Sequence, residues 1–453
     1  MPIPPAGVSM NIPPKFRWFP QARFGLFIHF GPYAIFERGE QVLMREAMDH
    51  HAYADAACQW NPQHVDAAQW ARVARAAGFK YAVFTTRHHD GYCMWDTATT
   101  DYSSARQAAG RDFVREYVDA FRAAGLRIGL YYSLGDWRIP AMFEGPERDP
   151  AGWGRFVQYC HAQVHELLSN YGKIDQLWFD GAWPRSSDDW RSRELIATIR
   201  KLQPDILVNN RAGSSTKKPN ADGGHGAGES EDLGDFGTPE HHITAEDRLW
   251  ESCQVSTWRL WGWARHERFR PADVLLDMLC ECAKKGGNLL LNVGPDAQGN
   301  LPATFVSHAA EIGQWLNVHG EAIYGTTAAA PHLESVLLGH VTQRDNDLYL
   351  ILRFYPPYGE LVIPGLATTI KNAVLLTTGQ SLEAQQTPRR WLLRGLPTQP
   401  PCSLFPVVKI TLAGPPTHHA WFEPGQWCGD PTRYTAWARE RGTSVWRDGQ
   451  PRP

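Results

Sequence analysis

Two polar segments of the chain combine imidazole, carboxylate and indole groups, which are suited to binding a sugar. The segment 87–91 (Arg-His-His-Asp-Gly) follows the apolar run 81–86, and the segment 177–181 (Leu-Trp-Phe-Asp-Gly) closes a run that starts at residue 174. Aromatic faces cover the C–H patches of a sugar ring, and imidazole and carboxylate groups hydrogen-bond its hydroxyls. These residue types predict a carbohydrate site built from two strand ends, where ligands collect in parallel α/β architectures.

Asp180 is the first candidate for chemistry. The period of two along a strand places Trp178 and Asp180 on one side, so both can face the same mouth of a sheet. Burying an aspartate charge without a partner is costly, so Asp180 needs a partner or a function. An aspartate that only caps the following turn is the alternative.

The adjacent His88 and His89 can reach one ligand only if their turn is tight. Together with His29, Asp90 or Asp180 they offer a metal site as one alternative. Core histidines that bond to the backbone are another. The sequence leaves both open.

A second carboxylate is needed if the chain is a retaining glycosidase, which uses two carboxyl groups roughly 5–5.5 Å apart. Glu240, in Thr238-Pro239-Glu240, and Glu251, in Trp250-Glu251, meet the residue-type requirement. Sequence alone gives no distance, and single carboxylates on loops are usually only solvated.

Seven short apolar runs predict the strands that must position these groups. They are 24–30, 81–86, 128–133, 174–179, 206–209, 249–253 and 288–293. Helical spacing, often ended by glycine, predicts helices over 65–77, 113–124, 156–168, 271–285 and 302–318. Seven such units in about 300 residues favour a (β/α)8-like TIM barrel over an open sheet, although no pattern identifies the eighth unit. His29 ends the first strand and Arg211 follows the fifth.

The pattern changes after about Tyr324, where short runs separated by proline and glycine predict an all-β module. We therefore expect a catalytic barrel over 1–325, a C-terminal β-sandwich over 326–429 and a polar tail over 430–453. The stretch 212–237 is rich in Gly, Ser, Asp and Lys and predicts a long loop on the catalytic face.

Composition excludes several classes of protein. A net charge of -3 and no basic run argue against nucleic-acid binding, and no apolar stretch reaches the roughly 20 residues that span a bilayer. The start has no signal-peptide pattern, which predicts a cytoplasmic protein, or a secreted or periplasmic one if a leader has been removed. Eight scattered cysteines predict neither disulfides nor a metal site. A homo-oligomer stays open.

Six blocks, in order along the chain, resemble the α-L-fucosidase family of glycoside hydrolases. They are 23–31 (RFGLFIHFG), 87–91 (RHHDG), 129–133 (GLYYS), 177–181 (LWFDG), 250–253 (WESC) and 286–295 (GGNLLLNVGP). The resemblance runs from about Arg17 to Thr326, and six blocks in order are highly specific. It implies a catalytic barrel followed by a β-sandwich, retaining hydrolysis of fucosylated oligosaccharides or glycoconjugates, no cofactor and no metal.

The resemblance also implies residue roles. Asp180 resembles the nucleophile, Glu240 is the first choice for the acid/base and Glu251 the second. The implied sugar-binding residues are His29, Glu40, His88, His89, Tyr131, Trp178 and Arg211.

One departure from the family pattern concerns a Glu-Trp pair that follows the first strand in many relatives. Here the matching residues are Glu40 and Gln41, so a tryptophan is missing, and Trp183 or Trp258 is expected to refill the wall. The insertion 212–234 is expected to reshape the leaving-group side. An exo-glycosidase for a related sugar such as α-L-galactose, a catalytically silent carbohydrate-binding protein and a metal-dependent barrel hydrolase are the alternatives.

Overall fold

The computed structural model describes residues 12–213, 233–329, 338–387 and 390–417, and two short pieces, 446–447 and 450–451. These divide into two compact units, the first formed by Met10–Asn317 and the second by the described residues from Val318 onward. Most of the predicted loop 212–237 and of the predicted tail 430–453 lies outside the described residues. The described part of that tail is an antiparallel pair of β18 (Trp446–Arg447) and β19 (Gln450–Pro451).

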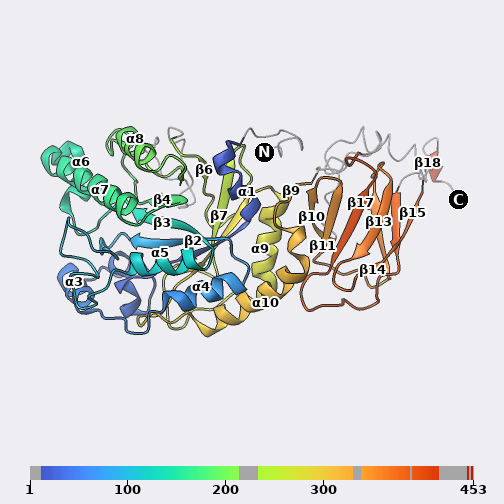
Figure 1. Ribbon diagram of the computed structural model, residues 1–453, viewed down its shortest axis with the longest axis horizontal. Coiled ribbons are helices and arrows are strands. Elements are labelled where there is room, and N and C mark those ends of the chain that lie inside the picture. Colours follow the sequence, from blue (N-terminus) through green and yellow to red (C-terminus); the bar gives the residue numbers. More distant parts are fainter. Residues whose placement is uncertain are drawn as a thin grey trace. The chain divides into compact units, whose positions relative to one another are not determined.

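The first unit is built on one parallel sheet of eight strands in the order β5-β4-β3-β2-β1-β8-β7-β6 (Figure 1). Its strands are β1 (Phe24–Ile28), β2 (Tyr81–Arg87), β3 (Arg127–Ser133), β4 (Gln176–Asp180), β5 (Leu207–Val208), β6 (Phe236–Gly237), β7 (Leu249–Val255) and β8 (Asn288–Val293). A parallel bridge between Asn209 and Phe236 joins the two ends of the sheet. The predicted (β/α)8-like barrel is therefore confirmed.

The eighth strand, missing from the sequence pattern, is β6. It has only two residues, Phe236 and Gly237, and pairs with Leu249 and Trp250 of β7. A two-residue strand is too short to display a period of two. Its place in the barrel is fixed by its neighbours: the Asp235 N–H donates to the Val208 carbonyl at 2.7 Å.

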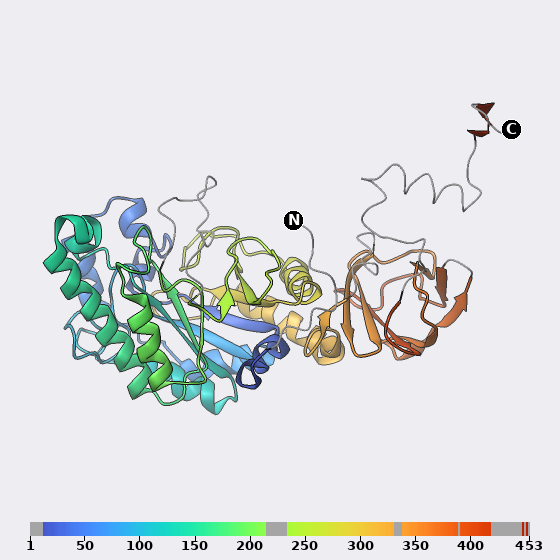
Figure 2. The same ribbon diagram turned by 90° about the horizontal axis from the view of Figure 1, so that it is seen from above.

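Helices lie between the strands around the sheet (Figures 1 and 2). They are α1 (Trp18–Ala22), α2 (Val42–Arg45), α3 (His50–Gln59), α4 (Ala67–Ala76), α5 (Phe113–Ala123), α6 (Pro140–Arg148), α7 (Pro150–Asn170), α8 (Ser192–Leu202), α9 (Ala272–Lys284) and α10 (Ala303–His319). All five predicted helices are present. The third of them, α7, begins six residues before the prediction, because the Asp149 side chain caps the Gly152 N–H and Pro150 fits the first helical position.

Aromatic side chains fill the interior of the barrel. Gly25, Phe27 and then His29 follow the period of two on β1, so the two buried positions lead up to a polar one at the carboxyl end. A Cβ atom on Gly25 would lie 2.3 Å from the Tyr81 ring, so that position must be glycine for the ring to fit. The layer above contains Phe27, Tyr131 and Trp178, which form the floor beneath the mouth.

The second unit contains a six-stranded antiparallel sheet, β14-β13-β17-β11-β10-β9, and a three-stranded sheet, β12-β16-β15. Leu350 and Ile410 of the first sheet share one core with Leu361 and Leu393 of the second, as expected for a sandwich. The bounds are β9 (Thr327–Ala328), β10 (Gly339–Arg344), β11 (Asp347–Leu352), β12 (Glu360–Pro364), β13 (Ile370–Leu375), β14 (Gln380–Ser381), β15 (Glu383–Gln386), β16 (Arg390–Arg394) and β17 (Val407–Leu412).

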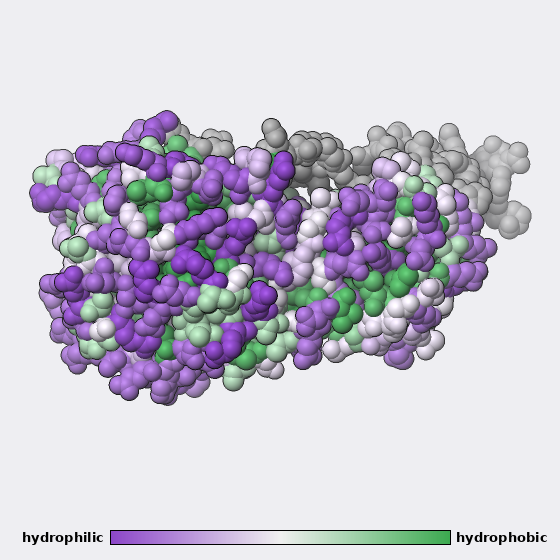
Figure 3. All heavy atoms as spheres, viewed as in Figure 1, coloured by the Kyte–Doolittle hydropathy of each residue, from purple (hydrophilic) through white to green (hydrophobic). Residues whose placement is uncertain are grey.

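The surface is mixed. Figure 3 shows a face of the molecule on which hydrophilic residues predominate and hydrophobic ones form smaller patches. Among the described helices, none is both long and apolar enough to cross a bilayer.

Candidate active site

A pocket opens at the carboxyl ends of the barrel strands. It collects the predicted site residues with two exceptions, Glu40 and Glu251. Its lining consists of Phe27, His29, Gln41, His88, His89, Tyr131, Trp178, Asp180, Trp183, Arg211, Glu240, Cys253 and Trp261. Residues far apart in the sequence meet here because parallel strands deliver their carboxyl ends to one face.

Asp180, the last residue of β4, lies at the centre of the polar contacts in this pocket. Its Oδ2 accepts a hydrogen bond from the Tyr131 hydroxyl at 2.9 Å and lies 3.7 Å from His89 Nε2. Burial alone would raise the pKa of Asp180, but the charges of Arg211 and His89 and the Tyr131 hydrogen bond outweigh it and hold the pKa below its usual value. Asp180 is therefore an ionised carboxylate at neutral pH.

Arg211 connects the two carboxylates that face the pocket. Its Nη1 donates to Glu240 Oε2 at 2.9 Å and lies 3.4 Å from Asp180 Oδ1. Two oxygens at these distances from one nitrogen are separated by at most about 6.3 Å, which is compatible with the carboxyl spacing of a retaining glycosidase. The guanidinium is fixed by Thr238, which accepts from Nε at its hydroxyl and from Nη2 at its carbonyl, both at 2.8 Å.

Glu240 is held in the wall by backbone contacts to the end of β7. The Cys253 N–H donates to the Pro239 carbonyl at 3.0 Å, and the His241 N–H donates to the Cys253 carbonyl at 3.2 Å. The side chain of Glu240 keeps 20% of its surface exposed, and His241 Nε2 lies 3.7 Å from Oε1. Glu240 is thus both anchored and accessible.

His29 and His88 are neutral side chains at the base of the pocket. Burial lowers the pKa of His29 to about 3, and its Nδ1 shares a hydrogen bond with Asn292 Oδ1 at 2.6 Å. Burial also lowers the pKa of His88, and the neighbouring His89 lowers it further. Their ring centroids lie 5.6 Å apart, with His88 stacked 5.7 Å from Tyr131. Neutral imidazoles can both donate to and accept from sugar hydroxyls.

Ser133 sets the tautomer of His89. The Ser133 hydroxyl donates its one proton to the Gly135 carbonyl at 2.8 Å, so its oxygen accepts from His89 Nδ1 at 2.7 Å. His89 therefore carries a proton on Nδ1, and Nε2 is the nitrogen turned toward Asp180. The sequence does not identify Ser133, the last residue of β3, as a site residue, because a serine at a strand end has no distinctive pattern.

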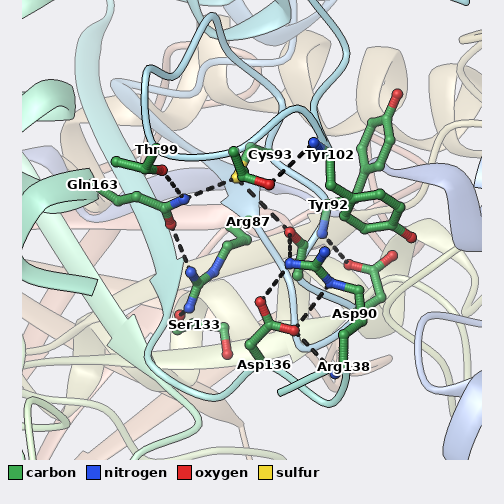
Figure 4. A network of polar contacts seen from close by, with 12 residues as sticks. Arg87, Asp90, Tyr92, Cys93, Thr99, Tyr102, Ser133, Asp136, Arg138 and Gln163 are labelled. Carbon is green, nitrogen blue, oxygen red and sulfur yellow. Dashed lines mark hydrogen bonds and ion pairs between the residues drawn. The ribbon is translucent and has the colours of Figure 1, made fainter. Parts of the chain in front are cut away.

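A buried polar network adjoins the two-histidine turn (Figure 4). The fully buried Arg87 donates to Gln163 Oε1 at 2.6 Å and to the Ser133 carbonyl at 2.7 Å, with its guanidinium over the Tyr132 ring. Arg87 is the first residue of the block 87–91. Its hydrogen bonds connect the end of β2 to the end of β3, and its side chain does not line the pocket.

Asp90 and Gly91 shape the same turn from the other side. Asp90 Oδ2 accepts from the Tyr53 hydroxyl at 2.7 Å, and burial raises the pKa of Asp90 to about 6. Gly91 has a φ of +74°, and a Cβ there would lie 2.3 Å from the Asp136 carboxylate, so only glycine fits. Arg138 pairs with that carboxylate at 2.7 Å. These contacts hold His88 and His89 in the tight turn that one shared ligand requires.

The structure does not bring Glu251 into the pocket. Glu251 lies one layer below, inside the barrel, while Cys253, two residues further on the same side of β7, lines the pocket. The carboxylate of Glu251 accepts from Tyr81 Oη at 2.6 Å, Gln176 Nε2 at 2.7 Å and Trp178 Nε1 at 2.9 Å. Burial raises its pKa to about 7, although these hydrogen bonds oppose the shift.

Glu40 also lies outside the pocket lining. Its Oε2 accepts from the backbone N–H groups of Trp261 and Gly262 at 3.1 and 2.9 Å, and its Oε1 lies 4.0 Å from Arg45 Nη2. The neighbouring Gln41 does line the pocket. Glu40 was predicted to bind the sugar. In the structure its carboxylate instead contacts the loop that carries Trp261 and does not line the pocket.

Trp183 and Trp258, the two tryptophans expected to replace the missing aromatic wall at Gln41, lie in different places. Trp183 lines the pocket, whereas Trp258 is 52% exposed and lies outside the pocket lining. Trp261, absent from the sequence candidates, completes the wall with its ring 5.2 Å from that of His29. The segment 258–263 carries three tryptophans, and only the contact with His29 in three dimensions singles out Trp261.

Within the described parts of the chain, no three His, Cys, Asp or Glu side chains are placed to hold one metal ion.

A sequence model of the family described as alpha-L-fucosidase matches residues 7–321. The chain belongs to the α-L-fucosidase family. It is similar to the tissue α-L-fucosidase of Bos taurus, with 29% identity over 91% of this chain and 89% of the relative. Among solved structures it is similar to α-L-fucosidase isoenzyme 1 from Paenibacillus thiaminolyticus, at a TM-score of 0.79 and 36% identity over 88% of this chain and 99% of the other.

Another similar structure is a family GH29 α-L-fucosidase from Bacteroides thetaiotaomicron, trapped as a covalent intermediate. It has a TM-score of 0.81 and 25% identity over 91% of this chain and 100% of the other. This protein is therefore a glycoside hydrolase of the α-L-fucosidase class, and its substrates are fucosylated glycans.

Proposed function

We propose that this fucosidase releases terminal α-L-fucosyl residues by a double displacement that retains the anomeric configuration. The observation that carries the proposal is the sharing of one Arg211 nitrogen by Asp180 and Glu240. One oxygen of each group lies at most about 6.3 Å from the other, which is compatible with the carboxyl spacing of roughly 5–5.5 Å in retaining enzymes. The covalent intermediate of the Bacteroides thetaiotaomicron enzyme supports the same chemistry.

In the first step, the ionised Asp180 attacks the anomeric carbon of the fucosyl residue. The glycosidic C–O bond breaks, and Glu240 donates a proton to the departing oxygen. In the second step, Glu240 takes a proton from water, and the water oxygen attacks the anomeric carbon and displaces Asp180. Glu240 is better suited to proton transfer than Glu251, because Glu240 faces the pocket and Glu251 is enclosed by three donors.

The remaining lining residues hold the sugar. Neutral His29 and His88, together with His89, offer nitrogens to its hydroxyls, while the faces of Trp178 and Trp261 cover its apolar side. The Arg211 guanidinium also lies over the Trp178 ring, 4.7 Å from its centroid. The same aromatic layer thus supports the sugar and the cation that pairs with both carboxylates.

The test is azide rescue of two alanine variants on an aryl α-L-fucoside. Asp180→Ala should lose about a thousandfold or more in turnover, and azide should restore it while forming β-fucosyl azide by single inversion. Glu240→Ala should still form the covalent intermediate from a good leaving group and yield α-fucosyl azide. Rescue to the α-azide in Glu251→Ala instead would show that the acid/base is Glu251, and unchanged turnover in Asp180→Ala would refute the mechanism.

Gln41 favours a second candidate substrate. This amide lines the pocket where many relatives carry a tryptophan, so it can hydrogen-bond to an added hydroxyl on C6 of the sugar, as in α-L-galactosides. Pockets built for a methyl group reject an added hydroxyl weakly. Turnover of 4-nitrophenyl α-L-fucoside and of the α-L-galactoside, each with and without a chelator, compares the two sugars and tests the metal-dependent alternative. Gln41→Trp should then reduce galactoside turnover more than fucoside turnover.

A further inference from the structure

Three large apolar side chains are exposed among the described residues of the barrel unit. They are Met44, Phe143 and Trp258, and each lies in a segment that follows the carboxyl end of a strand. A single exposed apolar side chain is ordinary, but Trp258 also lines a hollow in the surface together with Arg259, His266, Glu267 and Arg268. Trp258 is the largest of them, with 52% of its surface exposed.

The loop that carries Trp258 is fixed rather than loose. It follows β7 and folds back on itself through an antiparallel bridge between Thr257 and Phe269. The Trp258 N–H donates to the Arg268 carbonyl at 3.1 Å, and the Thr257 hydroxyl donates to the Leu260 carbonyl at 2.9 Å. A ring on such a loop is held ready before any ligand arrives, which lowers the ordering cost of binding.

The same loop forms part of the catalytic pocket. Trp261 lines the pocket, and Asn292 Nδ2 and Glu40 Oε2 hold its backbone carbonyl and N–H at 2.7 and 3.1 Å. Trp258 lies three positions before Trp261 in the chain, so their Cα atoms lie at most roughly 11 Å apart. Trp258 is therefore within reach of the first or second sugar beyond the fucosyl residue.

The loop that carries Trp258 adjoins the side of the pocket that holds Glu240. His241 lies 3.7 Å from Glu240 and 5.2 Å from the Trp261 ring. Burial lowers the pKa of His241, the Glu240 charge raises it, and the nearby Arg270 charge lowers it again. Arg270 lies 5.1 Å from the centroid of the Trp258 ring. Trp261, on the same loop as Trp258, thus contacts His241 beside the proposed proton donor Glu240.

We propose that Trp258 is the stacking platform of a leaving-group subsite that binds a pyranose ring of the glycan to which the fucose is attached. Arg270 covers part of the indole, and the exposed remainder offers an aromatic surface to the C–H face of a sugar. Arg259 and His266 line the same hollow and supply donors and acceptors for the hydroxyls, while the nearly buried Glu267 carboxylate pairs with Arg259 at 3.0 Å. This inference rests on the proposed function and names the part of the substrate that Trp258 selects.

The experiment compares wild type, Trp258→Ala and Trp258→Phe on two kinds of substrate. One is α-L-fucosyl fluoride, whose leaving group has no ring, and the other is a panel of fucosylated tri- and tetrasaccharides that covers the common linkages. In Trp258→Ala, the ratio of kcat/KM on the preferred oligosaccharide to kcat/KM on the fluoride should fall about tenfold, which corresponds to about 1.4 kcal/mol. Trp258→Phe should recover most of the ratio. Phe354→Ala, a similarly exposed aromatic position in the second unit, is the matched control and should leave the ratio unchanged.

Each outcome decides a different point. An unchanged ratio in Trp258→Ala, or a wild-type enzyme that turns over the fluoride but no oligosaccharide, would overturn the subsite. With 4-nitrophenyl α-L-fucoside assayed as a third substrate, a ratio to the fluoride that falls only for this aryl fucoside would assign the platform to aromatic leaving groups and also overturn the subsite. Absence of turnover on the fluoride would instead refute the proposed function.

Discussion

The variant Glu251→Gln tests whether the Glu251 carboxylate has a structural role or a catalytic one. Glu251 is fully buried, and three neutral groups donate to it, from Tyr81, Gln176 and Trp178. Glutamine has the same shape and keeps an oxygen for the bonds from Gln176 and Trp178. Trp178 should therefore stay in place, and the pocket floor with it.

The magnitude follows from the pKa of Glu251, which burial raises from 4.5 to about 7. A shift of that size corresponds to about 3 kcal/mol, at roughly 1.36 kcal/mol per unit. Because the folded-state pKa is raised, the folded protein binds the proton more tightly, and its free energy of unfolding falls as pH rises from about 4.5 to about 7. Glu251→Gln has no proton to lose, so this part of the pH dependence should disappear.

Unfolding by urea at a series of pH values, followed by tryptophan fluorescence, measures the effect as the difference between wild type and variant. Glu251→Gln should become more stable relative to wild type by up to about 3 kcal/mol between pH 4.5 and pH 8. Its kcat/KM should stay within about tenfold of wild type for both good and poor leaving groups. A stability difference that does not change with pH, or a loss confined to poor leaving groups as expected of Glu240→Gln, would refute this reasoning.

Three further substitutions test residues that position or charge the groups of the active site. Arg211→Met should lower kcat/KM by about a hundredfold and move the acidic limb of the pH profile to higher pH, because the charge that opposes burial and lowers the Asp180 pKa is gone. Ser133→Ala removes the group that fixes the His89 tautomer, so KM should rise with a smaller change in kcat, and Ser133→Thr should restore it. Asp90→Asn should flatten the fall in stability between about pH 4 and pH 6, since burial raises the pKa of Asp90 to about 6 and wild type loses stability as it ionises. Steady-state kinetics and pH-dependent unfolding measure these outcomes.

The sequence predicted the site where the strand pattern carried the information. His29, His88, Asp180 and Arg211 each end or follow a strand, and the barrel brings strand ends together whatever the details of the loops. Glu251 also lies on a barrel strand, but it does not reach the pocket. Periodicity predicts which side of a strand a residue faces, but not how deep in the barrel it lies. Glu251 lies one layer below Cys253, and only the coordinates distinguish the two.

The features that the sequence did not predict depend on contacts between distant segments. β6 is recognisable only through its pairing with β7 and the bridge from Asn209. Trp261 is indistinguishable from Trp258 in the sequence. Its backbone donates to Glu40 and accepts from Asn292, each more than thirty residues away in the chain, and these bonds set its place in the pocket. Such contacts have no local periodicity and no composition signal, so they appear only once the barrel is assembled.

The contacts of Arg211 suggest why one guanidinium suffices for both steps of the proposed reaction. Before attack, Asp180 is the ionised carboxylate and Glu240 carries the proton that the leaving group needs. In the covalent intermediate, Asp180 is an ester and Glu240 has given up its proton, so the single negative charge has moved from one carboxylate to the other. Arg211 Nη1 lies 3.4 Å from the first and 2.9 Å from the second, so the cation need not move to follow the charge. A fixed dipole or cation that serves both states without reorganisation is the arrangement that lowers barriers in an enclosed site.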